Sequence, residues 1–295
     1  MKELPKFKID FFCIGAPKSG STWLSQCLSE HPQITISRRK ETNFFARKLS
    51  SFGDEDNPKY LIDWRWYKSL FDQAKPNSIL GDCSINLMHN TLDAAFNIKK
   101  SFPEAKFIVI LRNPIKRVYS NFWHEKRYDL KRGMPETFED ALNNSEMLFR
   151  SKYYELLSYW LTVFPLGRFF IITDIELLEN KDLVLAQLFR FLQVDSTFVP
   201  PSANKRVNEA KSANAMIFWG RRIVYWMFRN NLSHLVEYLY KSKIDKILFG
   251  IWTKTTPYPP LSKATEARLM EYYLDDINNL ERLLNKDLSA WKAIQ

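Results

Sequence analysis

An eight-residue loop near the start of the chain, Gly15 to Thr22, has residues that could bind a phosphate group. It follows Lys8 to Ile14, a short apolar run typical of a buried strand, and leads into Ser21 to Ser29, which favours a helix. The backbone N–H groups of such a loop and the positive end of the helix attract anions. The alternative is an ordinary strand-to-helix turn that contains glycine.

The lysine of this loop is in an unusual place for a nucleoside-triphosphate site. Nucleoside-triphosphatase loops read G-x-x-x-x-G-K-[ST], whereas here Ser21 follows Gly20 and the lysine is Lys18. Those enzymes also hold Mg²⁺ with an acidic residue, but the strongest later strand, Lys106 to Leu111, is followed by Arg112. The loop is therefore expected to bind a 5′-phosphate without a metal.

A second candidate phosphate site begins at Arg112. A guanidinium offers a planar pair of donors to a phosphate, and the hydroxyl of Ser120 would add a directed donor. Asn113 and Pro114 are typical of a helix cap and first helical residue, so they would fix where Ser120 points. The alternative is that Arg112 pairs with a carboxylate and Ser120 is a neutral helix residue.

Together the two motifs resemble those of sulfotransferases that use 3′-phosphoadenosine 5′-phosphosulfate (PAPS). Pro17 to Trp23 resembles the 5′-phosphosulfate loop of that family, and Leu111 to Ser120 resembles its 3′-phosphate motif. The resemblance implies that Lys18 stabilises the leaving phosphate and that Trp23 stacks on adenine, with a core position as the alternative for Trp23. It implies donor contacts from Lys18, Ser19, Gly20, Ser21, Thr22, Trp23, Arg112 and Ser120.

A candidate general base lies between the motifs. Arg39 to Phe45 resembles the K-E-x-x-F-F segment of the heparan-sulfate and bacterial branch of the family, and this resemblance implies that Glu41 takes the proton of the acceptor. Many relatives have His where Asn43 stands, which leaves Glu41 as the one evident base of this segment. A surface carboxylate paired with Lys40 is the alternative for Glu41.

The acceptor side is expected to use this segment and a second one. Leu80 to Ser84 falls where relatives have a G-E-K-[ST] segment near the acceptor, and Cys83 replaces the lysine of the heparan enzymes. Acceptor recognition should therefore differ, and an ordinary turn residue is the alternative for Asp82. The resemblance implies acceptor contacts from Lys40, Asn43, Asp82 and Ser84.

The elements that must position these residues alternate between strands and helices. The expected strands are residues 8–14, 34–36, 106–111 and 169–173, together with a short strand that opens at residues 79–80. The expected helices are residues 21–29, 64–71, 92–102, 151–164 and 183–192, a helix that starts at residues 113–114, and one or two helices over residues 261–284. This alternation predicts one α/β domain, residues 1–295, with a central parallel sheet flanked by helices. Because ligands sit beyond the carboxyl ends of parallel strands, Gly15 and Arg112 should face one crevice.

Composition limits the partners. The 295 residues carry a net charge of +10, which attracts anions, but no nucleic-acid-binding motif is present. The three cysteines have no metal-ligand or disulfide spacing, so no metal is expected. The aromatic and basic segment 206–260 predicts a helical covering layer, with an acceptor lid or a peripheral membrane contact as the alternative. With no signal-like start and no run of ~18 apolar residues, a cytoplasmic location is expected.

These patterns predict a sulfotransferase that moves a sulfuryl group from PAPS to a hydroxyl or amine of a carbohydrate or small-molecule acceptor. The product of the donor would be 3′-phosphoadenosine 5′-phosphate (PAP). Two alternatives stay open: a P-loop kinase-like phosphotransferase, and a catalytically inactive module that binds a nucleotide or an anionic glycan. The sequence does not indicate an oligomeric state.

Overall fold

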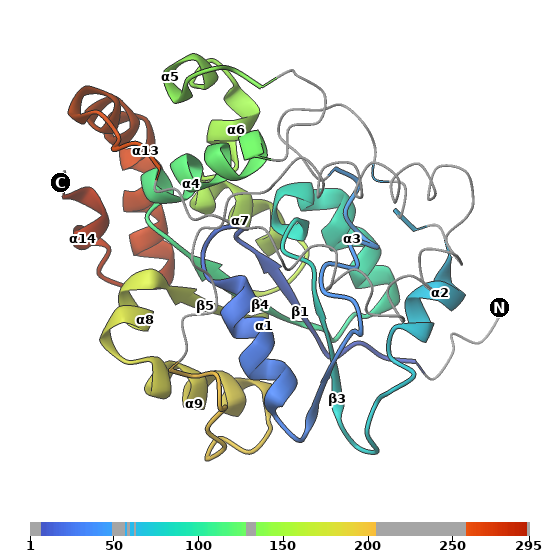
Figure 1. Cartoon of the computed structure of the whole chain (residues 1–295). Coiled ribbons are helices and arrows are strands. Elements are labelled where there is room, and N and C mark those ends of the chain that lie inside the picture. The colour runs from blue at the N-terminus through green and yellow to red at the C-terminus, as the bar shows by residue number, and fades with distance from the viewer. Residues whose placement is uncertain are drawn as a thin grey trace, which may run out of the picture.

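A five-stranded parallel sheet forms the centre of the protein (Figure 1). The computed structural model describes residues 7–48, 57, 60, 61, 63–127, 134–204 and 258–293. The strand order is β2-β3-β1-β4-β5, and every neighbouring pair is parallel. The strands are β1 (Phe11–Gly15), β2 (Ile34–Ile36), β3 (Ile79–Cys83), β4 (Lys106–Leu111) and β5 (Phe169–Thr173). This is the α/β fold that the sequence predicts.

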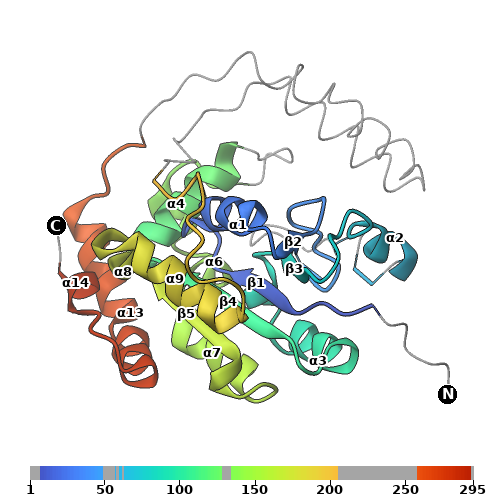
Figure 2. The same ribbon diagram turned by 90° about the horizontal axis from the view of Figure 1, so that it is seen from below.

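Alternate side chains of the central strands pack on the two faces of the sheet. Phe12 of β1 belongs to one buried cluster and Phe11 to the other, as the two-residue period of a strand requires. Figure 2 shows α1 (Ser21–Glu30) on one side of the sheet and α3 (Thr91–Ser101) and α7 (Tyr153–Leu161) on the other. Helices on both faces explain why the strands are apolar along their length.

Side-chain caps begin several of the helices. Thr173 caps α8, Asn180 caps α9 and Ser262 caps α13, each by accepting a hydrogen bond from an N–H of the first turn. The remaining elements are α2 (Trp64–Ser69), η1 (Leu87–Asn90), α4 (Pro114–Arg127), α5 (Phe138–Ala141), α6 (Ser145–Phe149), η2 (Leu166–Arg168), α8 (Asp174–Glu179), α9 (Lys181–Leu192), α13 (Lys263–Leu284) and α14 (Ser289–Lys292).

The structure confirms the boundaries predicted for β2, β4 and β5 and moves others by a few residues. Strand β1 begins at Phe11 rather than Lys8. The sequence does not predict α5, α6 and α8, because one or two turns are too short to show a helical period. Residues 206–257 of the predicted covering segment 206–260 lie outside the described residues. No helix in the described part of the chain is both long and apolar enough to cross a membrane.

Candidate active site

The loop after β1 has the backbone of an anion-binding turn. Lys18 and Gly20 both have positive φ, 70° and 101°, and Gly20 precedes the first residue of α1. At φ 101° a side chain would be strained, which explains the glycine. The first N–H groups of a helix lack partners within it, and the first turn of α1 has no acidic residue to repel an anion.

A buried hydroxyl in the same loop indicates what the loop is built to hold. Ser19 is 6% exposed, and its Oγ is buried with no hydrogen-bond partner among the residues that the structure describes. Buried polar atoms are rarely left without a partner, because each one costs about 1–3 kcal/mol. The Ser19 hydroxyl, the open side of Gly20 and the start of α1 therefore fit a phosphate or phosphosulfate group.

The two predicted phosphate motifs lie side by side. Strands β1 and β4 are neighbours, and the Ala16 N–H donates to the Ile110 carbonyl over 2.8 Å. Arg112 Nη1 then donates to the Lys18 carbonyl over 3.2 Å. Arg112 is partly exposed, and among the described residues no carboxylate pairs with it, as the alternative interpretation would require. This confirms the expectation that the carboxyl ends of β1 and β4 lie next to each other.

The helix that carries Ser120 is fixed at its start. Asn113 Oδ1 accepts from the N–H groups of Ile115 and Lys116 over 3.0 and 3.1 Å, which confirms the predicted cap of α4. The Asn113 amide also donates to the Trp291 carbonyl over 3.0 Å. Ser120 is 8% exposed on α4. Its direction thus depends on the cap at the start of α4 and on a contact from Trp291, 178 residues after Asn113.

Three further hydrogen bonds hold the same motif. Asp174 Oδ2 accepts from the Asn113 N–H over 3.1 Å, and Asp174 Oδ1 accepts from the Trp291 indole over 2.7 Å. The Tyr153 hydroxyl donates to the Arg112 carbonyl over 2.9 Å. The backbone around Arg112 is therefore held by α7, α8 and α14, which are separate in the sequence.

The candidate base lies next to the phosphate loop. Lys40 Nζ donates to Thr22 Oγ1 over 2.7 Å and lies 3.6 Å from Glu41 Oε1. Lys40 and Glu41 thus form the ion pair that the alternative interpretation requires. Lys40 also binds Thr22 in the first turn of α1. The Glu41 side chain is 37% exposed, so an acceptor can approach it.

Two predicted acceptor contacts are corrected by burial. Asp82 and Ser84 are 0% exposed, so neither can touch an acceptor in this structure. Their segment belongs to β3 and its end, which accept hydrogen bonds from the N–H groups of Glu41 and Asn43. Asn43 is nearly buried as well, and its carbonyl accepts from Asn57 Nδ2 over 2.6 Å. Lys40 and Glu41 are the members of the predicted acceptor side that are partly exposed.

Trp23 packs partly buried on the core, as the alternative interpretation predicts. Its indole N–H donates to the Ala203 carbonyl over 3.1 Å, and its ring packs partly buried against the cluster that contains Leu24 and Ile34. The indole thus anchors α1, and the Trp23 side chain is partly exposed. The structure does not test the adenine contact.

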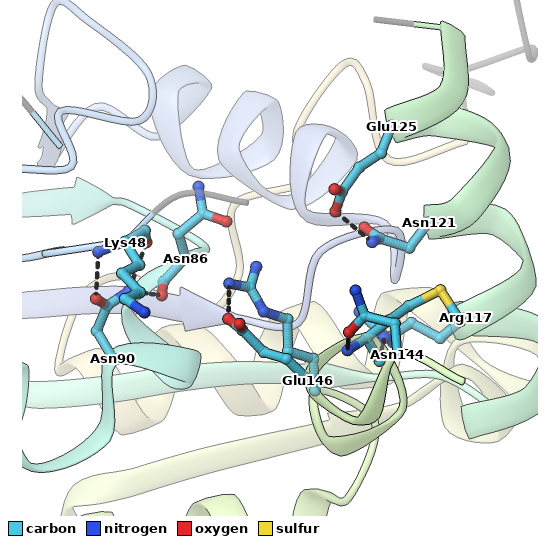
Figure 3. A network of polar contacts seen from close by, with 10 residues as sticks. Lys48, Asn86, Asn90, Arg117, Asn121, Glu125, Asn144 and Glu146 are labelled. Atoms are coloured by element: carbon cyan, nitrogen blue, oxygen red, sulfur yellow. Dashed lines mark hydrogen bonds and ion pairs between the residues drawn. The ribbon is translucent and has the colours of Figure 1, made fainter. Parts of the chain in front are cut away.

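Polar residues beside Ser120 were not singled out from the sequence. On α4, Asn121 Nδ2 donates to Glu125 Oε1 over 2.6 Å (Figure 3). Glu146 of α6 pairs with Arg150, the residue that follows this helix, at 2.7 Å. The four-residue spacing of the α4 pair on one helix face is the signal that could have found it. Near the base, Asn90 bonds the backbone N–H and carbonyl of Lys48, which ties the segment after Phe45 to η1 (Figure 3).

No group of histidines, cysteines or carboxylates within the described ranges could hold a metal ion.

A parallel sheet with a phosphate-type loop after β1 and an arginine after β4 defines an α/β protein of the P-loop-like kind. The chain belongs to the sulfotransferase family, which it matches over residues 10–198. The matched range contains both phosphate motifs and Glu41.

Several curated proteins are similar to the chain. It is 28% identical over 203 residues to bifunctional heparan sulfate N-deacetylase/N-sulfotransferase 1 of Caenorhabditis elegans, covering 65% of this chain and 22% of the relative. It is 26% identical over 302 residues to carbohydrate sulfotransferase 15 of Mus musculus, covering 77% and 53%. The chain therefore spans between about a fifth and about half of the length of these relatives.

A solved structure has the same fold over nearly the whole chain. The sulfotransferase from Alicyclobacillus acidocaldarius superposes with a TM-score of 0.68 and 21% identity, covering 97% of this chain and 100% of that one. At this identity the likeness establishes the fold alone.

Proposed function

We propose that the protein transfers the sulfuryl group of PAPS to a hydroxyl or amine of a carbohydrate or small-molecule acceptor and releases PAP. The observation that carries this proposal is the hydrogen bond from Arg112 to the Lys18 carbonyl, which joins the two phosphate motifs into one surface. A donor with phosphate groups at both its 5′ and 3′ positions suits such a surface. Membership of the sulfotransferase family supports the same reaction.

The donor side divides its work between binding and catalysis. Arg112 and Ser120 bind the 3′-phosphate, far from sulfur, so their binding energy orients the donor. The hydroxyl of Ser19 and the amides at the start of α1 hold the 5′-phosphosulfate. Lys18 stabilises the negative charge that grows on the departing phosphate oxygen.

The acceptor side supplies the base. Glu41 takes the proton from the acceptor oxygen or nitrogen as that atom attacks sulfur in line with the leaving phosphate. The new bond joins the acceptor atom to sulfur, the bond from sulfur to the phosphate oxygen breaks, and the proton ends on Glu41. Lys40 lies 3.6 Å from the Glu41 carboxylate and holds it next to Thr22.

The relatives favour a carbohydrate as the acceptor. The names of the similar curated proteins refer to heparan sulfate and to carbohydrate substrates. The net charge of +10 suits an anionic glycan. A small-molecule acceptor is the second choice, because Asn43 and Cys83 depart from the segments of the heparan enzymes.

The function is tested by PAPS turnover with a panel of glycans and small hydroxyl and amine acceptors, using the natural protein and Glu41→Gln. Glu41→Gln keeps the shape of the side chain and removes its basicity, so PAP binding should persist while transfer to a hydroxyl falls by ~10²–10⁴-fold. Glu155→Gln is the matched control, because Glu155 is 42% exposed and also pairs with a lysine, Lys152, at 3.8 Å.

The same assay separates the alternatives. An ATP-dependent phosphotransferase would require Mg²⁺ and would transfer phosphate rather than sulfate. A binding module without activity would bind PAP and sulfate none of the panel. Near-full transfer by Glu41→Gln with a hydroxyl acceptor would remove Glu41 as the base and leave the family assignment in place.

A further inference from the structure

Asp82 lies fully buried beneath the segment that carries Glu41. We propose that Asp82 is a positioning residue, whose carboxylate holds that segment in the conformation that aims Glu41 at the acceptor; this rests on the proposed role of Glu41 as the base. Its Oδ2 accepts from the hydroxyls of Thr42 and Tyr67, each over 2.8 Å. Its Oδ1 accepts from the hydroxyl of Ser84 over 2.7 Å.

Two of these hydroxyls also accept hydrogen bonds from backbone N–H groups of the segment that carries Glu41. Ser84 Oγ accepts from the Asn43 N–H over 3.0 Å, and Thr42 Oγ1 accepts from the Phe44 N–H over 3.2 Å. A hydroxyl has one proton, so a hydroxyl that donates to Asp82 turns its lone pairs toward these N–H groups. A carboxylate that accepts from the hydroxyls of Thr42 and Ser84 therefore sets the direction of their contacts with these two N–H groups.

The segment needs such support because its backbone is strained. Glu41 and Asn43 have φ values of 58° and 52°, in the left-handed region that residues other than glycine seldom adopt. Conformations of this kind persist only where the surroundings determine them, and they concentrate at functional sites. The Glu41 N–H also donates to the Cys83 carbonyl over 3.0 Å, so the end of β3 holds the segment at successive residues.

Asp82 is a costly way to fill this position if packing were its whole purpose. Burial raises the pKa of Asp82, and the hydrogen bonds from Ser84, Thr42 and Tyr67 oppose that rise. Its partners among the described residues are hydroxyls rather than cations, and its neighbours include the stacked rings of Phe44 and Tyr67. The hydrogen-bond direction that only a carboxylate gives accounts for its presence.

The test is a double-mutant cycle of Asp82→Asn with Glu41→Gln, measuring kcat, PAP affinity and thermal unfolding. The amide of Asn keeps the size of the side chain but cannot accept all three hydroxyl protons. We expect Asp82→Asn to lower kcat by about 10- to 100-fold, because a misplaced base loses most of its contribution. In the Glu41→Gln background the same change should alter kcat less than about twofold. PAP affinity should change little, since the donor site is untouched.

Two further variants keep the test decisive. Asp276→Asn alters another buried aspartate, which accepts from the N–H groups of Tyr154 and Glu155 over 3.1 Å each, and it should leave kcat unchanged. Should Asp82→Asn fail to fold, Ser84→Ala carries the test, because it removes the contact to Asn43 while leaving the carboxylate. Ser84→Ala should lower kcat in the natural protein, and it should change kcat less than about twofold in the Glu41→Gln background.

Each outcome is readable separately. An equal fold-loss from Asp82→Asn in both backgrounds overturns the proposal, because a general structural role is additive with Glu41. Unchanged kcat in a folded, PAP-binding Asp82→Asn or Ser84→Ala protein overturns it as well. The Glu41→Gln arm alone tests the proposed base, so a failure there is distinguished from a failure of the Asp82 assignment.

Discussion

Arg112 Nη1 donates a hydrogen bond to the carbonyl oxygen of Lys18, 94 residues earlier in the chain, over 3.2 Å. The contact places a guanidinium against the backbone of the loop whose lysine has a positive φ. It uses one N–H of the guanidinium and leaves others able to face a ligand, because Arg has five such donors. The two motifs therefore act as one surface rather than as separate sites.

Arg112→Ala should weaken PAP binding by about 10- to 100-fold, because hydrogen bonds to a charged group each contribute about 1.5–3 kcal/mol. Adenosine 5′-monophosphate, which lacks the 3′-phosphate, should lose much less affinity. Calorimetric titration of both ligands checks this. Arg168→Ala, which removes an arginine paired with Glu104 before β5, is the control. An equal loss for both nucleotides would place Arg112 away from the 3′-phosphate.

Lys18→Ala should lower kcat by about 10²–10³-fold and change PAP affinity far less, because the charge on the leaving oxygen grows in the transition state. Lys18→Arg keeps the charge and should retain part of the activity. Steady-state kinetics with saturating PAPS, together with PAP titration, separates the two effects. A variant that lost binding and kept kcat would show that Lys18 only holds the donor.

Asn113→Ala should destabilise the fold by about 1–2 kcal/mol through loss of the α4 cap. It should also weaken PAP binding, because α4 carries Ser120 and follows Arg112. Asn180→Ala is the matched control, since Asn180 caps α9 by accepting from the Leu183 N–H over 3.0 Å and lies outside both phosphate motifs. Urea unfolding and PAP titration of the two variants give the comparison. Similar affinity losses in both would refute a special role for the α4 cap.

Asp276 should make stability depend on pH. Burial raises its pKa to about 6, above the ordinary value of 3.8. The folded protein then binds more protons than the unfolded one between these values, so the free energy of unfolding falls as pH rises from about 4 to 6. The full effect is about 3 kcal/mol at most. Urea midpoints of the natural protein relative to Asp276→Asn, from pH 4 to 8, should decline across this window and level off above pH 7.

The sequence predicts the sheet well because burial on both faces makes its strands continuous apolar runs. Lys106 to Leu111 and Phe169 to Thr173 are of this kind, and both coincide with β4 and β5. The adjacency of Gly15 and Arg112 also follows from the rule for parallel sheets, and Arg112 does contact the loop. These features depend on local pattern and on a general rule of topology.

The environment of single polar residues could not be predicted in the same way. Asp82 stands between Gly81 and Cys83, a context that suits an exposed turn as well as a strand. Its burial depends on Tyr67 and Thr42, which reach it from other elements. The contact of Trp23 with Ala203, 180 residues away, is equally invisible to periodicity. Resemblance located these positions, and the tertiary contacts decided what each one touches.

Trp291 bonds Asn113 and Asp174 from a position 178 residues after Asn113. Chains are made from the amino end, and their early parts begin to fold first. A growing chain therefore contains both phosphate motifs before Asp174 and Trp291 have been added. The second motif receives its last contacts only when residue 291 has emerged. The order of synthesis thus places both phosphate motifs in the growing chain before the contacts that fix the second one can form.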